Sequence, residues 1–186
     1  MNEVIQNILT RRSIRAYTED QISNDDLNTL LEAAKFAPSG MGTQAWHFTA
    51  VQNIDKINKL ISAIKEALQK SPVEQLQKIG SNPNFNPFYN APTIIITAYD
   101  KNSPTKESDS AVALENIMLA AHSLNIGSCW IHALGIVGDD PSVRSILTEL
   151  GIPENYAIFG TAALGFSSKG EPKASPRKEG TVNIVK

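Results

Sequence analysis

A run of five β-branched residues, Thr93-Ile94-Ile95-Ile96-Thr97, constrains the fold more than any other stretch of this chain. Side chains branched at Cβ are stiff about χ1 and pack well on a pleated sheet. The run contains no charged residue, no glycine and no proline. It therefore predicts a strand that is buried inside the protein, and we expect the fold to contain a sheet around it.

Helical segments precede and follow this run in the sequence. Residues 2–9 show the helical spacing of apolar side chains. Ser23 and Asn53 are each placed to cap an amphipathic helix. Asp140 followed by Pro141 marks the start of another helix, since proline is favoured in the first helical turn.

An apolar stretch over residues 111–124 predicts a buried core helix. It contains Glu115, Asn116 and His122, so it is too short and too polar to span a bilayer. Ser108-Asp109 lies directly before this stretch, and we expect it to cap the helix. We accordingly expect no membrane partner.

Three further strands are expected, over residues 46–51, 128–131 and 156–166. The stretch 72–90 is harder to assign. Leu76 and Ile79 allow some helix, but prolines interrupt the stretch and aromatic residues cluster near its end. Two interpretations of those aromatics remain open at this point. They belong to a long functional loop, or they are folded into the core.

The order of these elements predicts the fold class. Helices and strands are mixed, without a regular β-helix-β alternation and its glycine turn, so an α+β fold is predicted rather than a doubly wound sheet. A length of 186 residues suits one domain over residues 1–186. Residues 167–186 form a polar, basic, proline-rich tail, which would fray unless it lies on another surface.

Composition narrows the possible partners and the compartment. The net charge is −2, which does not favour a nucleic-acid partner. Cys129 is the single cysteine, so no intrachain disulfide can form, as suits a reducing compartment. The N-terminal residues lack the basic and apolar regions of a signal peptide. We therefore expect a cytoplasmic protein.

A basic stretch near the N-terminus, Arg11-Arg12-Ser13-Ile14-Arg15, is the strongest candidate for a binding site. In an extended segment Arg11, Ser13 and Arg15 share one face, while Arg12 and Ile14 share the other. Guanidinium groups present forked donors that suit phosphate and stay charged at any working pH. On composition alone, a solvated basic run is the more ordinary interpretation.

Other candidate sites are weaker. Residues 40–45 fit a dinucleotide-binding glycine pattern, but a helix precedes them and a strand follows, the reverse of what that fold requires. Cys129 and His132 would point to opposite faces of a strand, which argues against a nucleophile and base pair. The three histidines lack metal-ligand spacing, so we expect no metal site.

Several stretches together resemble the FMN-dependent nitroreductase family. Residues 11–17 are similar to the family's opening motif, and residues 37–48 are similar to its second motif. Residues 109–131 resemble its central helix and the strand that follows. Residues 159–166 and 176–178 resemble the C-terminal part of the family's sequence. The resemblance covers nearly the whole chain except about residues 65–90, and the order and spacing of the motifs make it specific.

The resemblance implies an α+β fold with a central, mostly antiparallel sheet flanked by helices, in an intertwined homodimer with FMN at the interface. It implies that Arg11, Ser13 and Arg177 hold the FMN phosphate, and that Arg15 lies near N1 and O2 of the flavin. It also implies further residues at the cofactor: Arg12, Gln44, Ile131, His132 and Ala133, with Pro38, Ser39 and Gly40 supplied by the partner subunit. Backbone N–H groups of His132 and Ala133 would lie near flavin N5.

The implied activity is hydride transfer from NADH or NADPH, through bound FMN, to a flat small-molecule acceptor such as a nitroaromatic or a quinone. A fixed guanidinium at Arg15 would stabilise the negative charge that reduced flavin gathers near N1. The cofactor carries the chemistry, so no catalytic side chain is expected. The chain departs from many relatives at Gly42, where they have asparagine, and at Ala45, where they have proline.

Two alternatives to this activity remain open from the sequence. Some relatives of the fold use flavin for dehalogenation or cleave the flavin itself. A dimeric flavin-binding protein without enzymatic activity would have the same binding residues. The three possibilities share the flavin and differ in what reacts with it.

Overall fold

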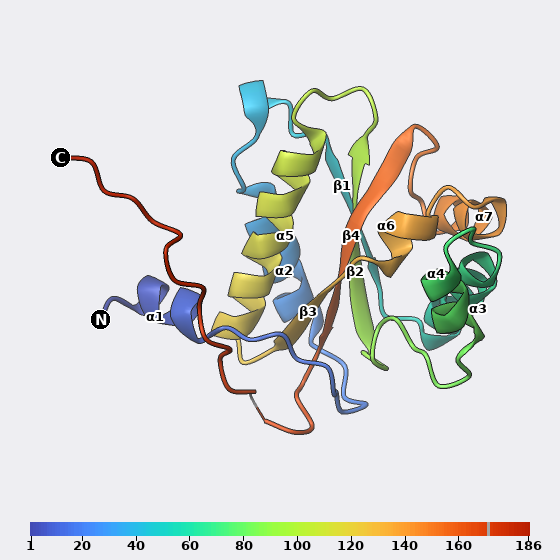
Figure 1. Ribbon diagram of the computed structural model, residues 1–186, viewed down its shortest axis with the longest axis horizontal. Coiled ribbons are helices and arrows are strands. Elements are labelled where there is room, and N and C mark those ends of the chain that lie inside the picture. Colours follow the sequence, from blue (N-terminus) through green and yellow to red (C-terminus); the bar gives the residue numbers. More distant parts are fainter. Residues whose placement is uncertain (171) are drawn as a thin grey trace.

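The computed structural model describes residues 1–170 and 172–186. Its centre is a sheet of four strands in the order β1-β2-β4-β3, in which every neighbouring pair is antiparallel (Figure 1). The strands are β1 (Trp46–Val51), β2 (Thr93–Asp100), β3 (Gly127–Ile131) and β4 (Tyr156–Gly165). The predicted α+β class and antiparallel sheet are confirmed.

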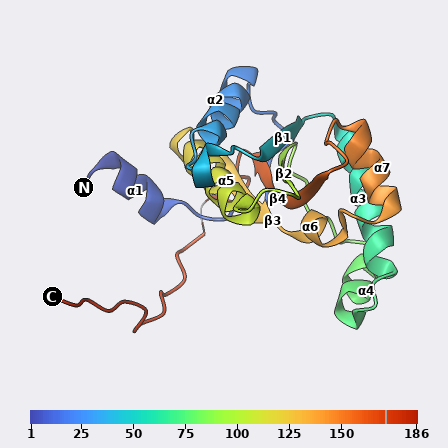
Figure 2. The ribbon, with the colours of Figure 1, turned by 90° about the horizontal axis from the view of Figure 1, so that it is seen from above.

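Helices cover both faces of this sheet. In Figures 1 and 2, α2 and α5 lie on one side, while α3, α4, α6 and α7 lie on the other. The helices are α1 (Glu3–Thr10), α2 (Asn24–Lys35), α3 (Ile54–Gln69), α4 (Glu74–Ser81), α5 (Lys106–Ser123), α6 (Ala133–Val137) and α7 (Pro141–Glu149), with a short 3-10 turn η1 (Gly40–Gly42) after α2.

The β-branched run lies in β2, as predicted, and both of its faces are buried. Ile94 and Ile96 pack into the core beneath α3 and α7, whereas Ile95 packs into the second core beneath α2 and α5. All three side chains are fully buried. The alternation of side chains along one strand thus supplies apolar contacts to both helical layers at once.

Three predicted helix caps are confirmed. The side chains of Ser23, Asn53 and Asp140 each accept a hydrogen bond from a backbone N–H in the first turn of α2, α3 and α7. The cap predicted at Ser108-Asp109 is wrong, because α5 already begins at Lys106. Asp109 instead points its carboxylate toward the loop before β1.

The stretch 72–90 contains α4, followed by a tight turn before β2. Of the aromatic residues in this turn, one is folded into the core and another is exposed, so each of the two interpretations holds for one of them. Phe88 is fully buried in the core, whereas Tyr89 remains 38% exposed. The short helix α6 was not predicted. It has no side-chain cap and spans five residues, so it leaves little periodic signal in the sequence.

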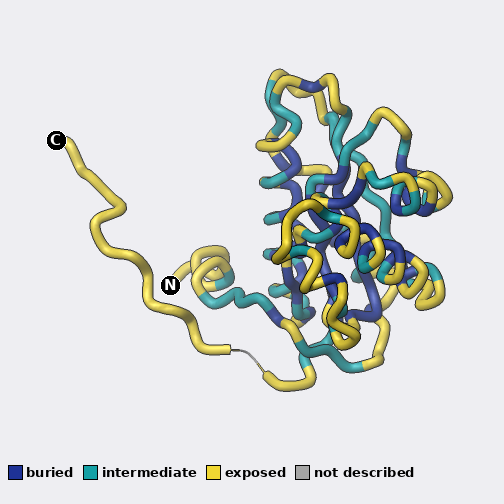
Figure 3. The backbone as a smooth tube through the Cα atoms, turned by 45° about the vertical axis from the view of Figure 1, so that its right-hand side comes forward, coloured by how far each residue is buried: buried dark blue, intermediate teal, exposed yellow. Residues whose placement is uncertain are grey.

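Both ends of the chain project from the main body. Figures 2 and 3 show α1 and the exposed C-terminal tail extending away from the sheet and its helices. Apolar side chains are exposed on both segments: Val4, Ile5, Ile8 and Leu9 on α1, and Val182, Ile184 and Val185 on the tail. Within residues 1–170 and 172–186, no helix has the length and apolar character needed to cross a membrane.

Candidate functional site

The basic stretch after α1 runs along the outer edge of β3. Ser13 forms a parallel bridge with Ser128, and the backbone N–H of Ile14 donates to the carbonyl of Ser128 at 2.9 Å. Ile14 is only 6% exposed. Because Ile14 turns inward, alternation along the extended chain directs its neighbours Ser13 and Arg15 outward.

Tyr17 fixes this segment to the sheet from the other side. Its hydroxyl donates to the carbonyls of Ile14 at 2.6 Å and Ala163 at 3.1 Å. Burial raises the pKa of the Tyr17 phenol above its usual range, so the hydroxyl stays protonated as a donor. Tyr17 also bridges to Ser167, which holds the start of the C-terminal tail beside the basic stretch.

The tail and the basic stretch enclose a cavity of about 330 Å³, here called the arginine cavity. Its described lining residues are Arg11, Arg12, Ser13, Arg15, Pro172, Lys173, Ala174, Ser175 and Arg177. Five of these side chains are cationic, and none of the described lining residues is acidic. The structure therefore brings Arg177 to Arg11 and Ser13, the three residues that the family resemblance assigns to a phosphate.

One donor atom of Arg11 has no partner. Its Nη1 atom is buried and has no hydrogen-bond partner among the described residues. The nearest carboxylate is that of Glu115, whose Oε1 lies 3.9 Å from Nε of Arg11. A buried donor without an acceptor costs free energy. Arg11 also lines the arginine cavity, so an anion bound there would lie close to its positive charge.

Arg12 differs from its neighbours. Its guanidinium donates to the carbonyls of Leu9 at 2.8 Å and Arg11 at 2.7 Å. These carbonyls lie at the end of α1, where backbone acceptors lack helical partners. Part of the donor capacity of Arg12 is thus used to close the helix, although the residue also lines the arginine cavity.

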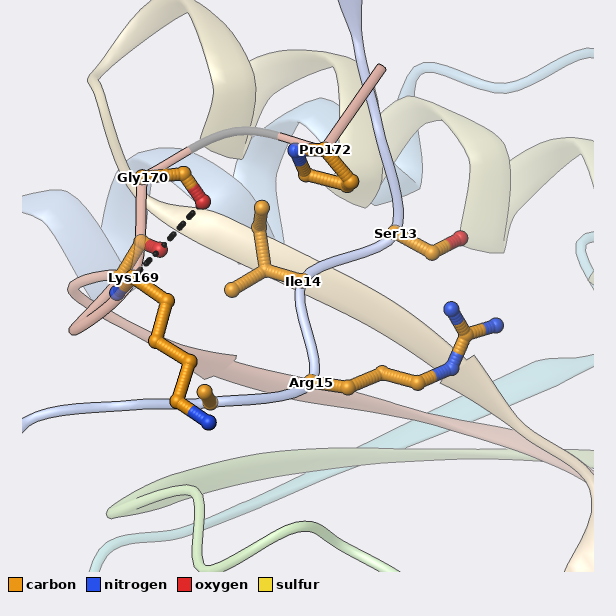
Figure 4. Close-up of a pocket in the computed structure, with 8 residues that line it drawn as sticks. Ser13, Ile14, Arg15, Lys169, Gly170 and Pro172 are labelled. Carbon is orange, nitrogen blue, oxygen red and sulfur yellow. Dashed lines mark hydrogen bonds between the residues drawn. The ribbon is translucent and has the colours of Figure 1, made fainter. Parts of the chain in front are cut away.

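A second cavity, of about 290 Å³, adjoins the first on the side of Arg15. Ser13, Ile14, Arg15, Lys169, Gly170 and Pro172 are among the residues that line it (Figure 4). Figure 4 shows the side chains of Ser13 and Arg15 directed to the same side, away from Ile14. The predicted alternation is therefore confirmed for Ser13, Ile14 and Arg15. Arg12 departs from it, because it lines the arginine cavity together with Arg11 and Ser13.

Strand β3 places three further candidates in line with the arginines. The bridge between Ser13 and Ser128 is parallel, so Arg15 lies farther along β3 than Ser13 does. Ile131 ends β3, and His132 and Ala133 begin α6. At a strand rise of about 3.3 Å per residue, Ile131 lies roughly 10 Å beyond Ser128. The arrangement suits an elongated ligand with its anionic end at Arg11.

Cys129 lies under this row rather than facing His132. Burial raises the pKa of its thiol, and the nearby Arg15 and Arg11 guanidinium groups only partly oppose that effect. Within residues 1–170 no hydrogen bond joins Cys129 to His132, and the sulfur instead lies 3.7 Å from the carbonyl oxygen of Trp130. A protonated, buried thiol of this kind is a core residue, not a nucleophile.

The comparisons with known proteins agree with this site. Residues 8–166 match the model of the nitroreductase family. The chain belongs to the nitroreductase family. Its structure is similar to that of a nitroreductase with bound FMN from Bacteroides fragilis, with 45% identity, full coverage of both chains and a TM-score of 0.97. A nitroreductase with bound FMN from Desulfitobacterium hafniense has 26% identity, full coverage of both chains and a TM-score of 0.88.

One curated relative is similar over most of this chain at a lower identity than the Bacteroides fragilis structure. A Vibrio harveyi protein named NADPH-flavin oxidoreductase is 28% identical over 185 residues, which cover 95% of this chain and 70% of that protein. Together with the solved structures, it shows that the resemblance read from the sequence motifs extends over nearly the whole chain.

In this member of the nitroreductase family, Pro38, Ser39, Gly40 and Gln44 lie outside both cavities described above. They follow α2 and lie near the start of α5, where the N–H of Gly40 donates to Oδ1 of Asp109 at 3.1 Å. Arg11, which lines the arginine cavity, instead approaches Glu115 in the middle of α5. The structure of one chain therefore brings together the residues expected at the phosphate and leaves this loop separate.

The loop is nevertheless held in a defined shape. Asp109 is 5% exposed and accepts hydrogen bonds from Gly40 and from the hydroxyl of Thr105, the latter at 2.8 Å. A Cβ atom on Gly40 would lie 2.4 Å from the Thr105 side chain, so this close approach requires glycine. Gln44 adopts a left-handed φ of 46°, and its N–H donates to the hydroxyl of Ser39 at 3.2 Å.

Tyr89 is a neighbour of the site that the sequence did not reveal. Its ring centroid lies 5.9 Å from Cζ of Arg15. The only signal available was the cluster of aromatics at the end of a stretch without family resemblance. That signal could not separate Tyr89, which reaches the site, from Phe88, which fills the core.

We expect Asp109→Ala to loosen the loop around Gly40. The substitution leaves the Gly40 N–H and the Thr105 hydroxyl without their acceptor, which should lower the free energy of unfolding by on the order of 1–3 kcal/mol. Hydrogen exchange at the Gly40 amide should become faster. Asp109→Asn is the control, because it keeps one acceptor oxygen and should cost less. Unchanged exchange at Gly40 in the alanine variant would contradict the anchoring role of Asp109.

Proposed function

We propose that this nitroreductase-family protein binds FMN and uses it to oxidise NADH or NADPH and to reduce a nitroaromatic, a quinone or a similar flat acceptor. The observation that carries the proposal is the cavity lined by five cationic residues and Ser13, with no acidic residue among its described lining. A phosphate supplies the acceptor oxygens that this cluster of donors lacks. The FMN-bound structures of the two nitroreductases and the name of the Vibrio harveyi relative support this assignment.

The residues present fit such a cofactor from one end to the other. Arg11, Ser13 and Arg177 would hold the phosphate, and Arg12 would contribute charge to the same cavity. Arg15 would lie beside the ring, where its fixed positive charge stabilises electron density gained on reduction. When bound, FMN supplies the exchange of a hydride between the nicotinamide and the acceptor. The remaining contacts would come from the end of β3, at Ile131, His132 and Ala133.

We further propose that the working protein is a homodimer, with FMN at the interface. Two observations support this assembly. Apolar side chains on α1 and the tail are exposed in the single chain, and ordering such segments without burying them gains nothing. The loop of Pro38, Ser39 and Gly40 is firmly held but lies outside the arginine cavity. A second copy would supply this loop to the ring.

The proposed activity predicts a visible redox cycle. The purified protein should be yellow, NADH or NADPH should bleach it under anaerobic conditions, and a nitroaromatic or quinone should restore the colour. Absorbance spectroscopy follows each step, and an acceptor series then ranks substrates. A yellow protein that neither nicotinamide bleaches would be a flavin-binding protein without this activity. A colourless protein that cannot take up FMN would contradict the proposal entirely.

Arg11→Ala should weaken FMN binding. Hydrogen bonds from a guanidinium to phosphate are charge-assisted and contribute about 1.5–3 kcal/mol each, which corresponds to roughly a 10- to 100-fold loss of affinity. Fluorescence titration of the apoprotein with FMN measures the effect. Lys178→Ala is the control, since it removes one positive charge from the tail at a residue that is not among those lining the arginine cavity. Equal affinities of the two variants would remove Arg11 from the phosphate site.

Removal of the tail after Phe166 should cost both the dimer and the cofactor. The tail provides Arg177 and the exposed apolar residues near the C-terminus, and permanent dimers bury more than about 2,000 Å². Sedimentation and the flavin content of the truncated protein test this. Full-length Arg177→Ala separates the two effects, because it should remain a dimer and bind FMN more weakly. A folded, truncated monomer that retains FMN would show that the site lies within one chain.

A further inference from the structure

The turn before β2 places an aromatic ring against Arg15. The centroid of the Tyr89 ring lies 5.9 Å from Cζ of Arg15, within the range of a cation–π contact. This turn ends the stretch, about residues 65–90, for which the sequence motifs showed no family resemblance. The contact assigns a local role to a segment that those motifs left without one.

Tyr89 reaches Arg15 through an unusual backbone. Tyr89 and the following Asn90 have φ values of 55° and 60°, both in the left-handed region. A left-handed conformation is unfavourable for a bulky aromatic residue, and two such residues in succession require support from their surroundings. A turn that merely connects α4 to β2 has no need to place a tyrosine in this conformation.

The support comes from the core and from the turn itself. Phe88 is fully buried, and its N–H donates to Oδ1 of Asn86 at 2.9 Å. The side chain of Asn86 also donates to Oδ1 of Asn90 at 2.6 Å, and the N–H of Ala91 donates to the carbonyl of Phe88 at 3.0 Å. Phe88 thus anchors the turn in the core, and the left-handed step turns the next ring outward.

An aromatic partner suits Arg15 better than a carboxylate would. Within the described residues, no aspartate or glutamate lies within ion-pair distance of Arg15. A carboxylate would hold the guanidinium but would also cancel its field at a nearby ligand. The face of a neutral ring restrains the guanidinium and leaves the positive charge available to the ligand.

We propose that Tyr89 is a positioning residue that holds the Arg15 guanidinium over its ring, so that the full charge of Arg15 acts on the reduced flavin. The proposal rests on the proposed function, since it requires FMN beside Arg15. Its direct consequence is electrostatic. Loss of the ring allows Arg15 to move toward water, where solvent screens its charge, and the reduction potential of the bound flavin then falls.

The test is a double-mutant cycle on the FMN-loaded protein, with the reduction potential measured by potentiometric titration. Arg15→Ala should shift the potential to a more negative value. Tyr89→Leu should shift it in the same direction by a smaller amount, and Tyr89→Phe, which keeps the ring, should retain the potential of the unmodified protein. The double variant Arg15→Ala/Tyr89→Leu should match Arg15→Ala alone, because Tyr89 acts through Arg15.

Each contrary outcome has a distinct meaning. If Arg15→Ala lowers the potential and Tyr89→Leu does not, Tyr89 has no positioning role while the proposed function stands. Additive shifts in the double variant would also overturn the proposal. If the protein binds FMN and Arg15→Ala leaves its potential unchanged, Arg15 is not at the ring and the inference fails with it. Should Tyr89→Leu not fold, Tyr89→Asn replaces it, because asparagine accepts a left-handed backbone more readily.

Discussion

The pairing of Ile14 with the edge of β3 is the contact on which the candidate site depends. One backbone hydrogen bond to Ser128 and the burial of the Ile14 side chain determine which side chains of the basic stretch point inward and which point outward. With Ile14 turned inward, Ser13 and Arg15 must point outward. The same edge continues to Ile131 and the start of α6. A single strand edge therefore aligns the expected phosphate residues with the residues expected beside the ring.

The tail is attached to this edge by the backbone. The N–H of Thr18 donates to the carbonyl of Phe166, and the N–H of Ser168 donates to the carbonyl of Ala16. These bonds determine where the chain leaves the sheet after β4, and so they bring Lys173 and Arg177 to the basic stretch. A chain with a net charge of −2 thus gathers five cations around one cavity. Mutual repulsion at such a cavity is relieved when an anion binds there.

Much of the fold was predictable because its signals are local. The β-branched run of β2 and the caps at Ser23, Asn53 and Asp140 are each indicated by a few adjacent residues. The role of Asp109 was not predictable in this way. Its partner Gly40 lies 69 positions earlier in the chain, and nothing in the spacing of the two reveals that the carboxylate reaches the loop instead of capping α5.

The residues of the candidate site also differ in whether local sequence could predict them. The alternation of Arg11, Ser13 and Arg15 follows from an extended backbone, which a short stretch of sequence can indicate. Tyr89 could not be found by such reasoning, because a left-handed φ at a non-glycine residue carries no compositional signal. That backbone conformation is imposed by the burial of Phe88 and by the Asn86 side chain. Tertiary packing, rather than local preference, decides which of two adjacent aromatics reaches Arg15.

The loop at Gly40 lies apart from the arginine cavity in the single chain. Asp109 and Glu115 are six residues apart on α5, which corresponds to about 9 Å along the helix. They lie on different sides of that helix, so the loop held by Asp109 and the arginine held near Glu115 face different directions. Within one chain, no residue of this loop is among the described residues that line the arginine cavity. In the proposed dimer, α5 of each subunit would instead hold one loop for its partner and one phosphate site for itself, and each cofactor would join the two subunits.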